Sequence, residues 1–404
     1  MKYQLLMLLS VFFSTLVNAN VKWQFDSQGL ISAKPLVHQE HIYLMSGKSL
    51  KVLNQKGQLT WQYALKSHTF SEVAIENNHI YLLADNGLHA INKQGELLWF
   101  FETQDRNRML NGETWGWGKK EVKDIWAWYR SSPIIVGDKV IFGNANGTFA
   151  IDKQTGQKIW HVDTGVTHTK PAFENNVVVV GSWNNNLYAL DINTGEIKWQ
   201  FEARVPNKLW EGWNGFNLDP LIFEGSVYVG SRGAYFYALD LQNGSEKWSS
   251  KFSNTWIGSA AVEHQGKIYF GTSDGFSLIG VDAKKGAQTL LYINDFYNFA
   301  QPQASDNTIY FGSVSGQIFA VNTHTMQGEK IFSTPESIIN YADLVNEEGG
   351  LKSKFSLGDN YSYETSAKDV QRMLNKLNSI LSITLHKNTL YITTAKGTLY
   401  ALAI

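Results

Sequence analysis

The sequence contains no cysteine in its 404 residues. Without cysteine the chain cannot form a disulfide, build a thiolate zinc site or carry a lipid on a cysteine side chain. An excess of one charge is also missing, because 35 lysines and arginines oppose 36 aspartates and glutamates, and no block of like charges stands out. Nucleic-acid binding needs a concentrated basic face, so the composition excludes nucleic acid as a partner.

The N-terminus carries the apolar stretch of an export signal. This stretch runs from about Leu5 to Val17 after one lysine, and Val-Asn-Ala precedes a cleavage point behind Ala19. It is shorter than the roughly 20 residues that a membrane-spanning helix needs. Residues 1–19 are therefore predicted to be a secretory signal peptide rather than an uncleaved anchor. We expect an exported chain without its own membrane anchor, periplasmic in a Gram-negative cell and otherwise secreted.

The rest of the chain consists of copies of one repeat, of which residues 171–201 are the clearest. That segment reads PAFENNVVVVGSWNNNLYALDINTGEIKWQF, with short apolar runs bounded by Gly, Asn and Pro. Such runs predict four antiparallel strands in about 35 residues, which is the size of one propeller blade. The pattern recurs at residues 35–65, 73–102, 133–164, 171–203, 220–252, 261–295, 302–334 and, without its fourth strand, 383–404.

The missing fourth strand of the last repeat is found at the other end of the chain. Residues 21–25, VKWQF, are similar to residues 198–201, KWQF. A blade cannot bury both of its faces alone, and a closed ring leaves no bare face at either end. We therefore predict a single all-β domain over residues 20–404. It is an eight-bladed β-propeller of four-stranded antiparallel blades, closed by pairing of the N-terminal strand with the C-terminal three.

Six of the fourteen tryptophans fall at one position of the repeat, in its last strand. This position predicts packing between neighbouring blades, and the glycines before it predict tight turns with positive φ. Residues 191–196 faintly resemble a calcium loop but recur as a hairpin turn, so we expect no metal there. The six tryptophans are Trp23, Trp61, Trp99, Trp160, Trp199 and Trp248.

The repeat resembles that of the pyrroloquinoline-quinone-type propeller family. Its pattern, G-S/T-x-x-G/N-x-L/F-Y/F-A-L/I-D-x-x-T/N-G-x-x-x-W, covers residues 21–404. The family includes quinone-dependent alcohol dehydrogenases and BamB-like outer-membrane assembly propellers. For the dehydrogenases, the resemblance implies a quinone stacked between a tryptophan and a disulfide of adjacent cysteines, with calcium beside a catalytic aspartate. This chain has no cysteine, so it is more similar to the cofactor-free BamB-like branch, without that branch's lipidated cysteine.

Three connections between blades are much longer than a blade needs, at residues 103–132, 204–219 and 335–382. In propellers these connections open on the same face as the loops between second and third strands, and the other eight tryptophans map to that face. They form either a core for the long loops or a binding surface for a protein, a glycan or a flat small molecule. The candidate binding residues are Trp115, Trp117, Trp126, Trp128, Tyr129, Arg130, Trp183, Trp210, Trp213, Arg232, Trp256 and Tyr297.

The mouth of the central channel is expected on the same face. Polar residues predominate where the innermost strands begin, which is typical of a solvated lining. Arg130 and Arg232 are candidates for holding an anionic group. The predicted mouth residues are Lys34, Glu72, Ser132, Lys170, Asp219 and Gln301.

The insertion at residues 335–382 contains a predicted helix. Ser366-Ala-Lys-Asp resembles a capped helix start, with an acidic residue three positions after the serine. An apolar stripe at helical spacing follows, which predicts that the helix lies on the propeller. The stripe consists of Val370, Met373, Leu374, Leu377 and Ile380.

No catalytic motif is present in the sequence. The histidines form no metal-ligand pair such as HExxH, and GxSxG, phosphate-loop and dinucleotide motifs are absent. The leading hypothesis is an exported, non-catalytic propeller that binds protein partners, in envelope or outer-membrane protein assembly, with no cofactor. One alternative is an oxidoreductase that holds pyrroloquinoline quinone with calcium. The other is a propeller that binds or cleaves saccharides on its aromatic face.

Overall fold

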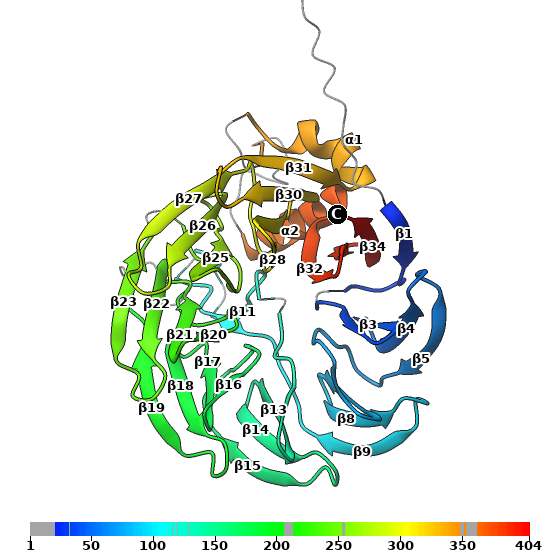
Figure 1. Cartoon of the computed structure of the whole chain (residues 1–404), viewed down its shortest axis with the longest axis vertical. Helices are drawn as coiled ribbons and strands as arrows, with labels where there is room; N and C mark the ends of the chain where they lie inside the picture. The colour runs from blue at the N-terminus through cyan, green and yellow to red at the C-terminus, as the bar shows by residue number, and fades with distance from the viewer. Residues whose placement is uncertain are drawn as a thin grey trace, which may run out of the picture.

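The computed structural model describes residues 21–31, 33–114, 116–118, 120–127, 129–205, 213–252, 255–347, 351–352 and 362–404. In this part of the chain, eight four-stranded antiparallel sheets stand around a central axis, as Figure 1 shows. The predicted eight-bladed β-propeller is therefore confirmed. The predicted signal peptide at residues 1–19 lies outside the described residues and stays a prediction.

The blades follow one another along the chain, and each is built from the axis outwards. Blade 1 consists of β2 (Leu36–His38), β3 (His41–Ser46), β4 (Ser49–Asn54) and β5 (Leu59–Ala64), and blade 2 of β6 (Ala74–Glu76), β7 (His79–Ala84), β8 (Gly87–Asn92) and β9 (Leu97–Glu102). Blade 3 consists of β12 (Ile134–Val136), β13 (Lys139–Asn144), β14 (Gly147–Asp152) and β15 (Lys158–Val162), and blade 4 of β16 (Ala172–Glu174), β17 (Val177–Gly181), β18 (Asn186–Asp191) and β19 (Ile197–Glu202).

The second half of the ring repeats this order. Blade 5 consists of β20 (Leu221–Phe223), β21 (Ser226–Gly230), β22 (Tyr235–Asp240) and β23 (Glu246–Lys251), and blade 6 of β24 (Val262–His264), β25 (Lys267–Gly271), β26 (Ser277–Asp282) and β27 (Gln288–Ile293). Blade 7 consists of β28 (Gln303–Ser305), β29 (Thr308–Ser313), β30 (Gln317–Asn322) and β31 (Gly328–Ser333), and blade 8 of β32 (Ile380–His386), β33 (Thr389–Thr394), β34 (Thr398–Ala403) and β1 (Val21–Asp26).

The ring is closed as the repeat pattern predicted. The strand β1 pairs antiparallel with β34, and Trp23 lies opposite Ala401 while Phe25 lies opposite Leu399. The indole of Trp23 also donates a hydrogen bond to the carbonyl of Gln55 in blade 1, at 2.9 Å. Blade 8 is thus completed by a strand from the opposite end of the sequence.

The repeated tryptophans pack between blades at the turn glycines. Gly244 has a φ of +71°, and a Cβ there would lie 2.7 Å from Cδ2 of Trp199, so the indole fits only against glycine. The Nε1 of Trp199 donates to the carbonyl of Leu241 at 2.8 Å, which satisfies its polar atom. Each of the other five repeat tryptophans also lies against the turn glycine of the next blade.

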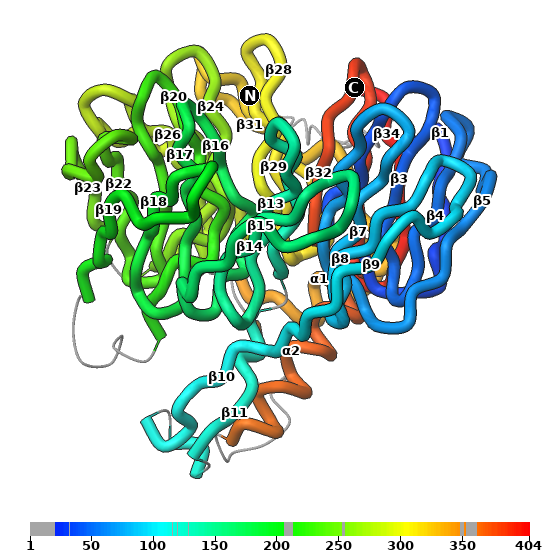
Figure 2. The backbone as a smooth tube through the Cα atoms, turned by 90° about the horizontal axis from the view of Figure 1, so that it is seen from below, coloured from blue at the N-terminus to red at the C-terminus, as the bar shows by residue number. Residues whose placement is uncertain are grey.

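Two insertions contain secondary structure of their own. In the first, β10 (Met109–Leu110) pairs with β11 (Val122–Lys123), and the third contains α1 (Pro335–Leu344) and α2 (Tyr363–Leu377). Figure 2 shows β10, β11 and α2 projecting together from one side of the disc. No helix was predicted at α1, although Thr334 caps it by accepting from the backbone N–H of Ser337 and Pro335 starts its first turn.

The predicted helix exists as α2, but two details of the prediction were wrong. Ser362, not Ser366, caps the helix, because its side chain accepts from the backbone N–H of Thr365 at 3.2 Å. Ser366 lies inside the first turn, where its N–H donates to the carbonyl of Ser362. Ile380 lies on β32 rather than on the helical stripe, because the left-handed Asn378 ends the helix.

Among the described residues, no helix is long and apolar enough to cross a membrane.

Candidate functional site

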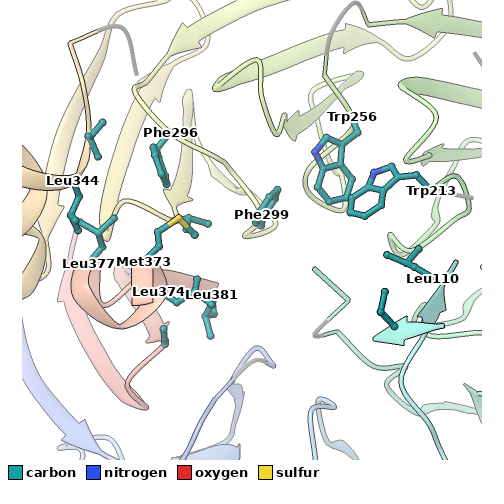
Figure 3. Packing of buried hydrophobic residues seen from close by; sticks show 14 of the residues in the cluster. Leu110, Trp213, Trp256, Phe296, Phe299, Leu344, Met373, Leu374, Leu377 and Leu381 are labelled. Carbon is teal, nitrogen blue, oxygen red and sulfur yellow. The ribbon is translucent and has the colours of Figure 1, made fainter. Parts of the chain in front are cut away.

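The three insertions gather on one side of the disc, which we call the loop face. It carries the described parts of the insertions at residues 103–132, 204–219 and 335–382, together with the loops between second and third strands. A single hydrophobic cluster joins these parts, as Figure 3 shows for Leu110 of the first insertion, Trp213 of the second and Met373 of α2 in the third. The rings of Trp117 and Tyr363 lie 5.6 Å apart and connect the first insertion to α2. The loop face is therefore packed as one unit.

Most of the described tryptophans of this face lie in or against the cluster. Trp213 and Trp256 are buried and meet edge to face, with ring centroids 5.5 Å apart. Trp117 is buried as well, and Trp126 is half-buried against Tyr297 at 5.9 Å. The three buried indoles therefore form a core for the loops, which is one of the two interpretations of the sequence. Three further candidates, Trp115, Trp128 and Trp210, lie outside the described residues.

Arg232 lies at the centre of this aromatic core. Its side chain is fully buried in the loop between β21 and β22, and its guanidinium lies 4.3–4.5 Å from the ring centroids of Trp183, Trp213 and Trp256. Its Nη1 donates to Oδ2 of Asp124, in the first insertion, at 2.6 Å. Its Nε and Nη2 have no hydrogen-bond partner within the described part of the chain, so the indole faces supply the remaining stabilisation.

A second guanidinium binds the same carboxylate. Nη1 of Arg108 lies 2.9 Å from Oδ2 of Asp124, and Nη2 donates to the carbonyl of Asn214 at 3.1 Å. Burial alone would raise the pKa of Asp124, but Arg232 and Arg108 outweigh burial and hold the pKa below its usual value. Burial in turn lowers the pKa of Arg232 to about 9. The carboxylate of Asp124 thus ties the first insertion to blade 5 and to the second insertion.

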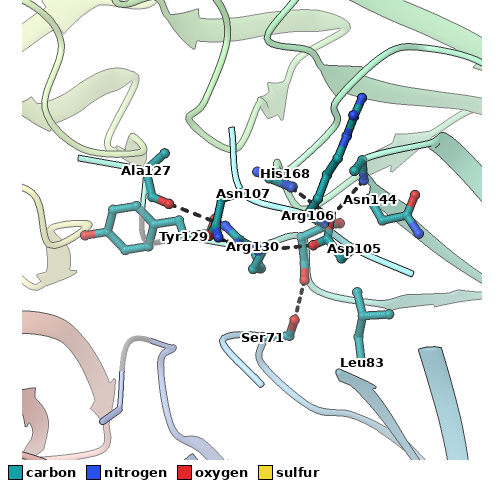
Figure 4. Close-up of polar contacts among 12 residues, drawn as sticks. Ser71, Leu83, Asp105, Arg106, Asn107, Ala127, Tyr129, Arg130, Asn144 and His168 are labelled. Atoms are coloured by element: carbon teal, nitrogen blue, oxygen red, sulfur yellow. Dashed lines mark hydrogen bonds and ion pairs between the residues drawn. The ribbon is translucent and has the colours of Figure 1, made fainter. Parts of the chain in front are cut away.

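Arg130 belongs to a second buried ion pair, shown in Figure 4. Its Nε lies 3.1 Å from Oδ2 of Asp105, and Nη2 donates to the side chain of Asn107 at 2.6 Å. The other oxygen of Asp105 lies 3.1 Å from Nε2 of the buried His168. Burial alone would raise the pKa of Asp105, but His168 and Arg130 hold it below its usual value. Arg130 and Arg232 therefore do hold anionic groups, and those groups are carboxylates of this chain.

The predicted mouth residues form a charged network across the channel. The carboxylate of Glu72 lies 3.2 Å from Nζ of Lys34 and 2.5 Å from Nζ of Lys170. Lys34 also donates to the side chain of Gln301 at 2.5 Å, and the N–H of Lys170 donates to Asp219 at 2.7 Å. Burial alone would raise the pKa of Glu72, but the two lysines lower it to about 2. In contrast, burial raises the pKa of Asp219.

A small cavity lies inside this network. Its volume is about 70 Å³, which is room for a few water molecules. Tyr129 and Arg130 border it, and the hydroxyl of Tyr129 donates to the carbonyl of Phe299 at 3.1 Å. The predicted mouth residues that line the cavity are Lys34, Glu72, Ser132, Asp219 and Gln301.

Two larger clefts flank the first insertion. A cleft of about 320 Å³ lies between this insertion and α2, with Lys123, Ile125 and Val370 among its lining residues. A second cleft, of about 640 Å³, lies between the insertion and blades 3 and 4, where Met109 and Trp183 contribute to the wall. Each cleft is far larger than the cavity at the mouth. A ligand would therefore fit on either side of the first insertion rather than at the mouth.

Sequence reasoning named Arg130, Arg232 and the mouth residues but missed their partners. Asp105, Arg108 and Asp124 lie in the first insertion, which has no repeat to align them with. The sequence separations are also large, since Asp124 is 108 residues from Arg232. The one available signal was that a buried arginine needs a carboxylate, and the first insertion contains four, Asp105, Glu113, Glu121 and Asp124.

The mouth does not fit the quinone and calcium pair that a dehydrogenase resemblance implies. The chain has no cysteine for the disulfide that would cover the quinone. The carboxylate of Glu72 is already engaged by two ammonium groups. Among the described residues, no three His, Cys, Asp or Glu side chains converge as metal ligands would.

The closed ring and its packed loop face define an eight-bladed propeller with an elaborated face, a class that includes enzymes and binding proteins. The chain belongs to the family described as outer membrane protein assembly factor BamB, whose profile matches residues 17–164, 110–210 and 147–404. The BamB of Shewanella oneidensis, described in the same words, is 32% identical over 72 residues. That match spans only 17% of this chain and 18% of the relative's length.

Solved structures share the fold across nearly the whole chain. BamB from Moraxella catarrhalis superposes with a TM-score of 0.66 at 16% identity, covering 96% of this chain and 100% of that one. A europium-containing methanol dehydrogenase gives a TM-score of 0.63 at 14% identity, with 96% and 94% covered. Since both identities are low, these likenesses show the fold and do not distinguish an assembly factor from an enzyme.

Proposed function

We propose that this chain is an exported, non-catalytic propeller that binds protein partners during the assembly of outer-membrane proteins. The observation that carries the proposal is the family profile, described as an outer membrane protein assembly factor, which matches from residue 17 to residue 404. The Moraxella catarrhalis BamB shares the fold over its whole chain, which agrees with the family but does not decide between the functions. An assembly factor of this kind works in the periplasm, which agrees with the predicted signal peptide.

The physical basis of the proposed activity is a surface that is ordered before the partner arrives. The ring has no free end, because β1 pairs with β34. The insertions are held to it by Asp124 and by the shared hydrophobic cluster. A partner that binds such a face need not order it, so less of the interaction free energy is lost on binding.

The contact surface that we propose is the loop face around the two clefts. Trp126 and Trp183 are partly exposed there, and Met109 is exposed at the rim of the larger cleft. Partly exposed aromatic side chains and methionine favour protein contacts because they offer apolar area at a small entropic cost. The buried tryptophans support this surface from below rather than contact the partner.

The proposal is tested by deleting the gene in its host and measuring the folded β-barrel proteins of the outer membrane, by their heat-dependent mobility on gels. We expect their amount to fall and to return with a plasmid copy of the wild-type gene. A Trp126→Ala, Met109→Ala copy should restore less than the wild type, at equal protein level in the periplasm. Unchanged outer-membrane proteins in the deletion strain would contradict the proposal.

An oxidoreductase is the second candidate, favoured only by the shared fold of the methanol dehydrogenase. It is tested with purified protein, pyrroloquinoline quinone and calcium, by following tryptophan fluorescence and the reduction of a dye with an alcohol as donor. We expect neither signal, because the carboxylate at the mouth is held by two lysines. Saturable quenching with dye reduction would overturn the non-catalytic proposal.

A further inference from the structure

The outer strands of blades 8 and 4, β1 and β19, share one pattern, and β9 of blade 2 departs from it. The strands β1 and β19 read VKWQFD and IKWQFE, whereas β9 reads LLWFFE. The tryptophan of β9 packs against the next blade as the other repeat tryptophans do, because the indole N–H of Trp99 donates to the carbonyl of Lys153 in blade 3 at 3.2 Å. The difference is confined to the two residues beside that tryptophan, Leu98 and Phe100.

Those two positions are polar in β1 and β19, whereas β15 of blade 3 also has an apolar residue, Ile159, at the first of them. Leu98 stands where β1 and β19 have Lys22 and Lys198, and Phe100 stands where both have glutamine. A lysine on an edge strand discourages another strand from pairing with it, because the incoming strand would have to cover the charge. The outer edge of blade 2 lacks this protection.

The apolar side chains of β9 are open to solvent. Leu97, Leu98 and Phe100 are 52%, 45% and 39% exposed. The strand is also the last of its sheet, in the order β6-β7-β8-β9, so one row of its backbone N–H and C=O groups has no strand beside it in the described part of the chain. An edge that offers both backbone groups and apolar side chains is suited to accept an added strand.

We propose that the outer edge of blade 2 binds an extended segment of a partner polypeptide as a fifth strand. This proposal rests on the proposed function, because it assigns one binding mode to the protein-binding platform. The segment has apolar side chains on alternate residues, so that they meet Leu98 and Phe100 on one face of the sheet. It has basic residues at its ends, because Glu96 precedes β9, Glu102 ends it, and the strand contains no lysine or arginine.

The molecule already uses this mode of binding once. The strand β1 arrives from the far end of the sequence and pairs with β34 through residues from Val21 to Asp26. Only an extended backbone satisfies such an edge, because a helix has no free N–H and C=O groups along its side. The occupant of the β9 edge is therefore a strand-forming segment rather than a folded helical surface.

The test uses the purified full-length exported chain and a fluorescent peptide, Lys-Thr-Val-Thr-Val-Thr-Val-Lys, with binding measured by anisotropy. Leu98→Lys with Phe100→Gln gives β9 the pattern of β1 and β19, so this variant is expected to fold. We expect it to bind the peptide at least tenfold more weakly than the wild type. The matched control, Lys198→Arg with Gln200→Asn on β19, keeps that edge charged and polar and is expected to bind as the wild type does.

A second peptide separates strand pairing from simple apolar contact. In this peptide the N–H groups of alternate residues, on one edge of the strand, are methylated, and a companion peptide carries the methyl groups on the other edge. We expect one of the two to lose binding, because one edge must face β9. The proposal would be overturned if both methylated peptides bound the wild type equally well. It would also be overturned if the β9 variant bound the unmodified peptide as tightly as the wild type does.

Two further outcomes are decisive. A wild-type protein that does not bind the peptide overturns the β9 proposal, while the platform stands if the gene deletion still lowers folded outer-membrane proteins. Light scattering tests whether the wild type is a dimer that the β9 substitutions abolish. A positive result would assign the edge to a second copy of the chain and would also overturn the β9 proposal. Peptide binding without any outer-membrane phenotype would instead leave the edge in place and remove the assembly role.

Discussion

The ring and the loop face bury tryptophan in two different ways. In the ring each indole covers the turn glycine of the next blade and, as at Trp199, donates its N–H to a backbone carbonyl. On the loop face the indoles meet other aromatic rings and surround the guanidinium of Arg232. The first arrangement repeats around the axis, and the second occurs once.

The two regions differ in how many contacts hold them together. A blade that loses one tryptophan still has the same contact repeated in its neighbours. The loop face depends on one carboxylate, Asp124, which forms buried ion pairs with both Arg108 and Arg232. Such a buried pair adds little stability compared with apolar residues, but removing one partner is costly. We therefore expect the ring to lose stability locally and the loop face to lose its order as a unit.

The largest expected effect is that of Trp199→Ala. The substitution removes a buried indole and leaves a cavity between blades 4 and 5, so we expect a loss of about 4 kcal/mol in the free energy of unfolding. Urea unfolding measures it. Ile197→Ala on the same strand is the control, because that side chain is exposed and its loss should cost less than about 1 kcal/mol. Similar losses in the two variants would show that the indole does not hold the blades together.

The next effect is that of Asp124→Asn, which leaves two buried guanidinium groups without their carboxylate. We expect a loss of about 3 kcal/mol, accompanied by a red shift of tryptophan fluorescence as water reaches the loop core. Asp343→Asn on the exposed side of α1 is the control, with an expected change within about 0.5 kcal/mol. An Asp124→Asn protein with unchanged stability and emission would mean that the insertions are held by the hydrophobic cluster alone.

A third effect appears at low pH, at the junction of the two regions. The pKa of Glu72 is lowered from 4.5 to about 2, so its stabilising contribution is complete above pH 4.5 and is lost as the pH falls from about 4.5 towards 2. The contribution is about 2–3 kcal/mol, allowing for partial exposure of the side chain. The stability of Glu72→Gln relative to the wild type should therefore improve by most of this amount between pH 6 and pH 2.5. A constant difference across this range would contradict the pairing of Glu72 with Lys34 and Lys170.

The smallest effect distinguishes the two candidate caps of α2. Ser362→Ala removes the acceptor for the N–H of Thr365 and should cost about 1 kcal/mol. Ser366→Ala lies within the helix and should change stability by less than about 0.5 kcal/mol. Urea unfolding followed by tryptophan fluorescence measures both. The reverse order would return the helix start to Ser366.

The sequence predicted what repeats and missed what occurs once. The blades, the closing strand at Trp23 and the turn glycines could be predicted because one pattern recurs in eight copies, and each copy can be compared with the others. The cap of α2 was misplaced because a serine, which can cap a helix, stands at both position 362 and position 366. The helix α1 was overlooked within a long insertion. The pairing of Asp124 with Arg232 joins segments 108 residues apart, and no periodicity in the chain relates them.

Hydrogen exchange of the backbone amides tests the central claim most directly, namely that the loop face is a folded body fastened to the ring by Asp124. In the wild type we expect protected amides in β10 and β11 as well as in β17 and β18. In Asp124→Asn we expect β10 and β11 to lose protection while β17 and β18 keep it. Unprotected β10 and β11 amides in the wild type, or equal loss of protection in both regions of the variant, would contradict the account.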